Sequence, residues 1–148
     1  DEEPISSVIT TAMEALVFAL KYDRVMLLLA DHNKGSLQGK MVLGKEFDVD
    51  PREFKRRVNG ARRGKLPDIN AFLEGAPRIT GEPIFAGCTP FAAIPVGCGD
   101  RTIGVIYADI KDKPENKNII PYSSSVKLAL DTLTELLDQT LALSRTQG

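Results

Sequence analysis

Residues 90–109 read PFAAIPVGCGDRTIGVIYAD, and this stretch decides the fold class. Apolar residues recur with strand-like alternation over residues 90–96, and residues 102–109 are rich in Ile, Val and Tyr, as strands usually are. The glycine-rich residues 97–100 between them are typical of a tight turn. The stretch therefore predicts a β-hairpin and, with it, a sheet.

A second hairpin is predicted upstream of the first. Residues 24–30 form an almost continuous apolar run of strand length, which is typical of a buried central strand. Turn-forming residues follow at 31–35 and include the single histidine, His32. Residues 37–43 then alternate between apolar and polar until Gly44.

Both ends of the chain show helical periodicity. Apolar residues recur at helical spacing over residues 4–20, and Val126, Leu130, Leu133 and Leu137 mark one stripe near the other end. Further apolar residues lie off a single stripe, namely Met13, Val17, Leu128, Ala129, Leu136, Leu141 and Leu143. We therefore expect the two terminal helices to pack on something besides the sheet.

The segment between the hairpins, residues 45–87, is expected to be mostly irregular because Gly and Pro interrupt it repeatedly. A capping-box pattern, D-P-x-E, predicts one short helix over residues 50–58. Asp68 is predicted to cap another over residues 68–73. The polar residues 111–118 predict a loop before the terminal helix.

The composition indicates one ordinary globular domain. The chain has 148 residues, 43% hydrophobic and 26% charged, with a net charge of -1. This charge disfavours a nucleic-acid partner, and no apolar run is long enough to cross a bilayer. No charged-then-apolar leader opens the chain either, so we expect a cytoplasmic protein. Because the sequence begins at Asp1 without a methionine, we expect residues 1–148 to be a single domain of a longer multidomain protein.

The order of elements resembles a GAF domain, a small ligand-sensing module of bacterial signalling proteins. The resemblance rests on DRVMLLL at 23–29, LQGKMVLG at 37–44, FAAIPV at 91–96 and IGVIYAD at 103–109. Within this family, the sequence is most similar to the GAF segments of bacterial HDOD-type proteins. The resemblance implies an α/β (α+β) fold with a central antiparallel sheet, the first and last helices on one face, and a ligand pocket beneath the irregular segment on the other.

Motifs of specialised GAF domains are missing. Bilin-binding members place a Cys directly before a His, whereas Cys88 precedes Thr89. Cyclic-nucleotide-binding members carry an Asn-Lys signature whose continuation is missing here. Cys88 and Cys98 would lie about 30 Å apart along one strand, which is too far for a disulfide, so both are expected to be buried thiols. The cofactor stays unknown.

Catalytic and metal-binding residues are not predicted. His32 stands in a turn, and residues 123–125, all serines, precede a helix that a hydroxyl would cap. Asp109 and Asp112 alternate with lysines, a pattern typical of a solvated loop.

Two groups of residues are candidates for binding. The first is a basic cluster, which is either a solvated face or an anion site: Arg52, Lys55, Arg56, Arg57, Arg62, Arg63 and Lys65. The second would line or roof the pocket that the resemblance implies: Phe47, Phe72, Arg78, Phe85, Cys88, Phe91 and Tyr107.

Three functions follow as hypotheses. The leading one is a non-catalytic sensory domain that binds a small molecule, anionic or nucleotide-like, or a partner, and relays the signal through its terminal helices to other domains of the same chain. The second is a structural dimerisation module without a ligand, and the third is a cysteine-dependent redox enzyme. A homodimer formed through the terminal helices is expected.

Overall fold

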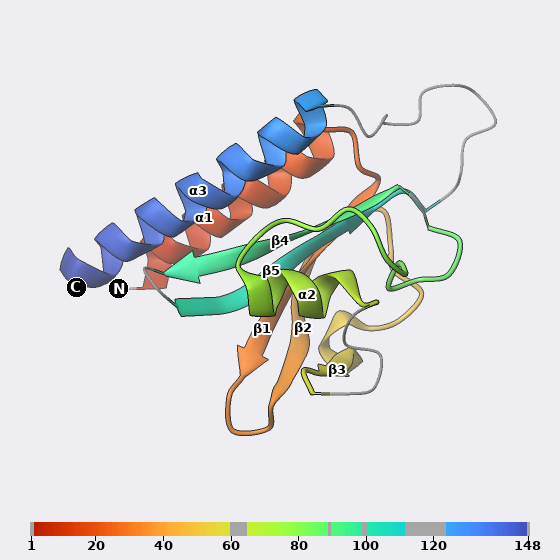
Figure 1. The fold of residues 1–148 in the computed structure, drawn as a ribbon, viewed down its shortest axis with the longest axis horizontal. Helices are drawn as coiled ribbons and strands as arrows, with labels where there is room; N and C mark the ends of the chain where they lie inside the picture. The colour runs from red at the N-terminus through yellow and green to blue at the C-terminus, as the bar shows by residue number, and fades with distance from the viewer. Residues whose placement is uncertain (1, 60–64, 89, 99–100, 112–123, 148) are drawn as a thin grey trace.

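The computed structural model describes residues 2–59, 65–88, 90–98, 101–111 and 124–147. Figure 1 shows how the elements are arranged. In chain order they are α1 (Glu2–Glu14), the π-helical turn η1 (Ala15–Ala19), β1 (Arg24–Asp31), β2 (Ser36–Gly44), the 3-10 turn η2 (Pro51–Glu53), β3 (Lys55–Arg57), α2 (Pro67–Glu74), β4 (Phe91–Cys98), β5 (Arg101–Asp109) and α3 (Ser124–Gln147).

Five antiparallel strands form one sheet in the order β3-β2-β1-β5-β4. β1 pairs with β2, and β4 pairs with β5, so both predicted hairpins are confirmed. The hairpins join through β1 and β5, where Arg24 lies opposite Asp109 and Leu28 lies opposite Val105. The first residue of β1 is therefore the neighbour of the last residue of β5.

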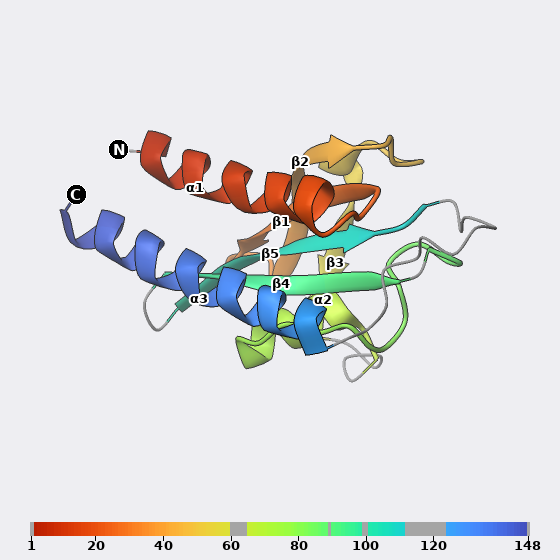
Figure 2. The same ribbon diagram turned by 90° about the horizontal axis from the view of Figure 1, so that it is seen from above.

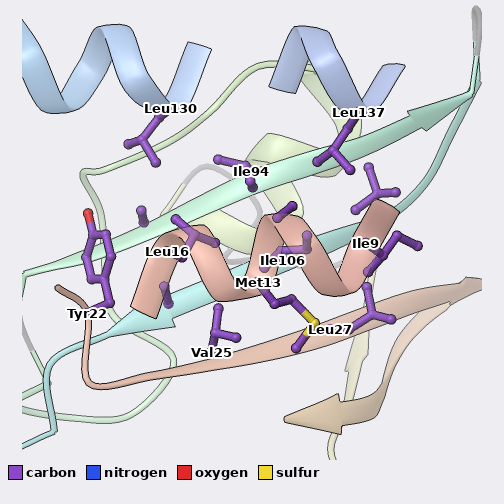
Figure 3. Close-up of a cluster of buried hydrophobic side chains, with 14 of the residues drawn as sticks. Ile9, Met13, Leu16, Tyr22, Val25, Leu27, Ile94, Ile106, Leu130 and Leu137 are labelled. Carbon is purple, nitrogen blue, oxygen red and sulfur yellow. The ribbon is translucent and has the colours of Figure 1, made fainter. Parts of the chain in front are cut away.

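α1 and α3 lie side by side on one face of the sheet (Figures 1 and 2). Their apolar stripes and the side chains that β1, β4 and β5 direct toward them form a large buried cluster (Figure 3). Met13 and Leu16 of α1 contribute to it, as do Leu130 and Leu137 of α3. The expectation that the first and last helices share one face is confirmed.

The stripe predicted for α3 is confirmed, since Val126, Leu130 and Leu137 are buried. Leu141 was expected off this stripe and is also buried, because it continues the four-residue step from Leu137 toward the same cluster. Among the side chains described on α1, η1 and α3, the large apolar ones that stay exposed are Phe18, Leu128, Leu136 and Leu143.

The opposite face of the sheet carries α2 and the irregular segment (Figure 1). Met26, Leu28 and Val105 alternate with the residues of the first cluster and form a second one with Ile69 of α2. Phe47 and other aromatic residues of the irregular segment pack against this second cluster. The α+β architecture that the sequence predicts is therefore confirmed on both faces.

The helix predicted over residues 50–58 is wrong. Asp50 does cap a turn, since its carboxylate accepts a hydrogen bond from the amide of Arg52 at 3.0 Å, but that turn ends at Glu53. Residues 55–57 are extended instead, because they pair with residues 36–38 as the edge strand β3. The sheet edge outweighs the local capping signal.

The role predicted for Asp68 is also wrong. α2 begins at Pro67, Leu66 stands at the cap position, and the side chain of Asp68 makes no cap. The carboxylate of Asp68 is fully buried instead and faces Arg56 of β3. The helix itself ends close to the predicted position, at Gly75 in a left-handed conformation with φ of 68°.

The passage from α1 to β1 has an unusual backbone. α1 continues into the π-helical turn η1, and the amide of Leu20 donates to the carbonyl of Ala15 at 3.0 Å. Lys21 follows with φ of 68°, the one non-glycine residue with positive φ among those that the structure describes. Residues 20–23 thus turn the chain sharply from the helix layer into the sheet.

Several predictions fall on residues outside the described ranges. These residues are Arg62, Arg63, Gly99, Asp100, residues 112–118 of the predicted loop, and Ser123. α3 begins at Ser124, so the position predicted for the start of a helix agrees with the structure. His32 is exposed in the β1–β2 turn, as predicted.

Candidate functional site

A buried ion pair lies on the loop-covered face, at one end of the sheet. Arg24 opens β1 and Asp109 closes β5, and both side chains are 0% exposed. The Arg24 Nε donates to Asp109 Oδ1 at 2.7 Å, and Nη2 donates to Oδ2 at 3.3 Å. Such two-point pairing of a guanidinium with a carboxylate fixes both partners in orientation. The expectation that Asp109 belongs to a solvated loop is therefore wrong.

Tyr107 extends this pair into a network. Its hydroxyl donates to Asp109 Oδ2 at 3.0 Å and accepts a hydrogen bond from the amide of Ile84 at 3.2 Å. Burial raises the pKa of the Asp109 carboxyl, and the hydrogen bond and charge of Arg24 oppose that shift. Burial and the neighbouring Asp109 also raise the pKa of Tyr107, so its hydroxyl keeps its proton and acts as a donor.

Cys88 completes the polar part of the site. Its Sγ accepts a hydrogen bond from Arg24 Nη2 at 3.3 Å and lies 3.8 Å from the carbonyl oxygen of Lys111. The thiol is free and buried, as the sequence predicts. Burial and the Asp109 carboxylate raise the pKa of Cys88, which keeps the sulfur protonated. The side chain of Cys98, at the end of β4, lies outside the part of the chain whose side chains are described.

Two phenyl rings lie close to the Arg24 guanidinium, on neighbouring sides of it. Its Cζ lies 4.2 Å from the ring centroid of Phe47 and 4.9 Å from that of Phe85. The two rings are themselves 5.3 Å apart, centroid to centroid. Phe91 stacks on the Tyr107 ring at 6.3 Å. We call this group of seven residues the Arg24 cluster: Arg24, Phe47, Phe85, Cys88, Phe91, Tyr107 and Asp109.

Residues 45–48 cross over the Arg24 cluster. The carbonyl oxygen of Glu46 accepts from Arg24 Nη1 at 3.2 Å and from Lys111 Nζ at 3.4 Å. Lys111 also pairs with Asp48 at 3.6 Å, and Lys45 pairs with Asp23 at 3.6 Å. These outer ion pairs involve partly exposed side chains and therefore hold the segment weakly.

The structure thus brings together five of the predicted site residues, namely Phe47, Phe85, Cys88, Phe91 and Tyr107. Phe72 packs against the second apolar cluster from α2. Arg78 forms an ion pair with Glu74, and its backbone bridges to Ala93 of β4. Its contacts thus lie with α2 and β4. Arg24 was not predicted, although a lone arginine at the start of a buried apolar run was a signal for it.

Arg56 gives the basic cluster a structural role. Its Nε lies 3.2 Å from Asp68 Oδ2, and its guanidinium lies over the ring of Phe54 at 5.6 Å. Neither oxygen of Asp68 meets full hydrogen-bond geometry with the described residues. Arg52, Lys55 and Arg57 are exposed, which agrees with the solvated face.

Asp68 predicts a measurable pH dependence. Burial raises its pKa above the ordinary 3.8, against the opposing charge of Arg56. The folded state therefore binds this proton more tightly than the unfolded state, so Asp68 favours folding as the pH falls through its folded pKa and opposes folding as the pH rises. We expect Asp68→Asn to remove this contribution and to be at least as stable as the unmodified domain at neutral pH.

Urea unfolding of both proteins between about pH 4 and 7 checks this expectation. The difference between the two curves isolates Asp68, because other carboxyl groups contribute equally to both. Asp131→Asn, at an exposed position on α3, is the matched control. A variant that instead loses stability at neutral pH would show that the attraction of Arg56 outweighs burial.

Metal and membrane sites are not indicated in the described residues. Their His, Cys, Asp and Glu side chains form no group of three that could hold a metal ion. Their helices include none long and apolar enough to cross a membrane.

An apolar groove of about 220 Å³ runs between α1 and α3, lined among others by Val8, Leu133 and Leu136.

Comparison with solved structures identifies the fold. The chain is similar to the GAF-B domain of DevS from Mycobacterium smegmatis, with a TM-score of 0.72 and 14% identity over 97% of this chain and 96% of that one. It is also similar to a GAF domain/HD domain protein from Geobacter sulfurreducens, with a TM-score of 0.65 and 14% identity over 96% and 94%. The architecture is the GAF fold.

An enzyme shares this fold. A free methionine-R-sulfoxide reductase from Neisseria meningitidis, solved with its substrate, aligns with a TM-score of 0.69 and 17% identity over 100% of this chain and 83% of that one. No protein-family model matches the sequence, and no curated protein matches it either. The likeness therefore defines the fold, and function has to be argued from the site.

Proposed function

We propose that the chain is a non-catalytic sensory or regulatory GAF domain of a bacterial signal-transduction protein, similar to the GAF segments of HDOD-type proteins. It acts in the cytoplasm, binds a small molecule at the Arg24 cluster and relays the signal through its terminal helices to other domains. The main support is the placement of the cluster. Arg24 and Asp109 lie on the loop-covered face of β1 and β5. The opposite face of these two strands packs against the helices α1 and α3, so the same strands contact both the cluster and the terminal helices.

The chemistry of Cys88 supports a role without catalysis. The thiolate is the reactive form of cysteine, and the raised pKa of Cys88 disfavours that form. The Cys88 side chain is also buried, and its sulfur accepts a hydrogen bond from Arg24. A thiol-dependent turnover of methionine sulfoxide by the purified domain would revive the enzyme hypothesis.

Thermal-shift screening of the domain against nucleotides and metabolites tests the ligand part of the proposal. We expect at least one chemical class to raise the melting temperature, since a ligand that binds only the folded state stabilises it. A domain that responds to none of them would fit the second hypothesis, a structural module. One observation favours that alternative: the guanidinium of Arg24 already lies against the rings of Phe47 and Phe85 and pairs with Asp109, so these groups have an internal partner.

The helix layer supports a homodimer. Leu136 and Leu143 of α3 are 53% and 61% exposed and lie seven residues apart, on the same side of the helix. Leu136 also lines the apolar groove between α1 and α3. Exposed leucines beside an apolar groove are suited to an isologous helix bundle between two copies.

Substituting Leu136→Glu together with Leu143→Glu should therefore convert a dimer to a monomer, because four carboxylates would face each other across the interface. Light scattering at tens of micromolar, on the order of ordinary assay concentrations for a weak complex, measures the mass. Lys127→Glu, at an exposed position on the opposite side of α3 from Leu136, should leave the dimer intact. An unmodified domain that is already monomeric contradicts the proposal.

A further inference from the structure

The walls around Arg24 have the chemistry of a cation site. The two phenyl faces of Phe47 and Phe85 lie within 5 Å of the guanidinium carbon, and the Asp109 carboxylate meets its edge at two points. Aromatic faces attract cations through the ring quadrupole, and this attraction grows when water is excluded. The carboxylate adds charge and the planar geometry that matches a guanidinium.

Arg24 itself is not available to an anion. Its Nε and Nη2 donate to Asp109, Nη2 also donates to Cys88, and Nη1 donates to the Glu46 carbonyl. An anionic ligand would have to break the Asp109 pair inside the protein, which leaves a buried charge without its partner. A cationic ligand would replace one guanidinium with another and keep the Asp109 carboxylate paired.

The cover over this site is the segment of residues 45–48. The amide of Lys45 ties its start to the Asp23 carbonyl at 3.0 Å. Beyond Lys45, the Glu46 carbonyl accepts from Arg24 and Lys111, and the side-chain ion pairs of the segment with Asp23 and Lys111 are 3.6 Å long and join partly exposed groups. Exposed pairs of this kind contribute little stability, so the segment can open without unfolding the sheet. Asp48, which is 74% exposed, then offers Arg24 a partner at the surface.

We propose that Phe47, Phe85 and Asp109 form a binding site for a small cation of the guanidinium class, and that Arg24 occupies this site as an intramolecular ligand until such a cation displaces it. The inference rests on the proposed sensory function and names the ligand class of that site. In this proposal, the described conformation is the state in which Arg24 occupies the site. Binding of the ligand displaces the Arg24 side chain past residues 45–48.

Chemical rescue tests the walls of the site. Arg24→Ala removes the occupant and should lower the melting temperature, and methylguanidinium at about 10 mM should restore a large part of the loss. Sodium chloride at the same ionic strength should restore none of it. The double variant Arg24→Ala with Asp109→Asn is the matched control, since it retains the rings but lacks the carboxylate. No rescue in a folded Arg24→Ala variant overturns the proposal.

Displacement is tested in the domain that keeps Arg24, so the result does not depend on whether Arg24→Ala folds. In a Cys98→Ser background, Cys88 is the sole thiol, and its Sγ lies 3.3 Å from Arg24 Nη2. Its rate of labelling by a thiol reagent should rise several-fold and saturably with methylguanidinium. A rate that does not change with methylguanidinium would show that Arg24 is a permanent structural partner, and this overturns the proposal.

The two tests separate this inference from the sensory function. If another class of metabolite stabilises the domain while guanidinium compounds neither rescue nor expose Cys88, the cation site is wrong and a sensory domain remains. If guanidinium compounds bind but the exchange of backbone amide hydrogens in α1 and α3 stays unchanged, the cation site stands and relay through the helices is wrong.

Discussion

Replacing Asp109 with Ala should lower the free energy of unfolding by about 3–5 kcal/mol, because it leaves the fully buried guanidinium of Arg24 without its counter-charge. The hydroxyl of Tyr107 loses its acceptor in the same step. Urea unfolding followed by far-ultraviolet circular dichroism measures the change.

A paired control distinguishes loss of a partner from loss of an interaction. In the variant Arg24→Met with Asp109→Leu, both charges are removed and the side-chain volume is roughly kept, so much of the lost stability should return. If the single Asp109→Ala variant costs less than about 1 kcal/mol, the pair would resemble an exposed surface ion pair, and the burial of Arg24 would be in question.

Replacing Leu130 with Ala should have an effect of similar size, about 2–5 kcal/mol. Leu130 is fully buried where α3 meets the sheet, so truncation removes apolar contacts and leaves a cavity (Figure 3). Urea unfolding measures the loss. Leu73→Ala on α2 deletes the same atoms from a side chain that is 43% exposed, and it should cost distinctly less. Equal losses in the two variants would contradict the packing described for α3.

The hairpins and the terminal helices could be predicted because each carries its own periodicity. The alternation over 37–43 and the apolar run over 24–30 persist for several residues, and the structure places both in strands. β3 has only three residues, which is too short for a period, and its extended backbone comes from pairing with residues 36–38. A capping pattern in the sequence carries no information about a distant strand edge, so residues 50–58 were predicted as a helix.

The site was predicted only in part for the same reason. The aromatic residues and Cys88 came from the family resemblance, which indicates the irregular segment as the roof of a pocket. Arg24 and Asp109 are separated by 85 positions in the sequence and meet only through the register of β1 and β5. Each looked like the polar end of a strand, and the register that joins them cannot be derived from either strand alone.

The left-handed residue at the end of the first helix gives the domain a short torsional linkage. Residues 20–23 alone join the π-helical turn to Arg24, and Lys21 holds a backbone conformation that L-residues rarely adopt. The amide of Asp23 is fixed to the carbonyl of Asp109 at 3.0 Å, so the sheet end of this linkage cannot rotate freely. A twist of α1 about its own axis must therefore be taken up at Lys21 and in the π turn, or reach the backbone of Arg24 directly.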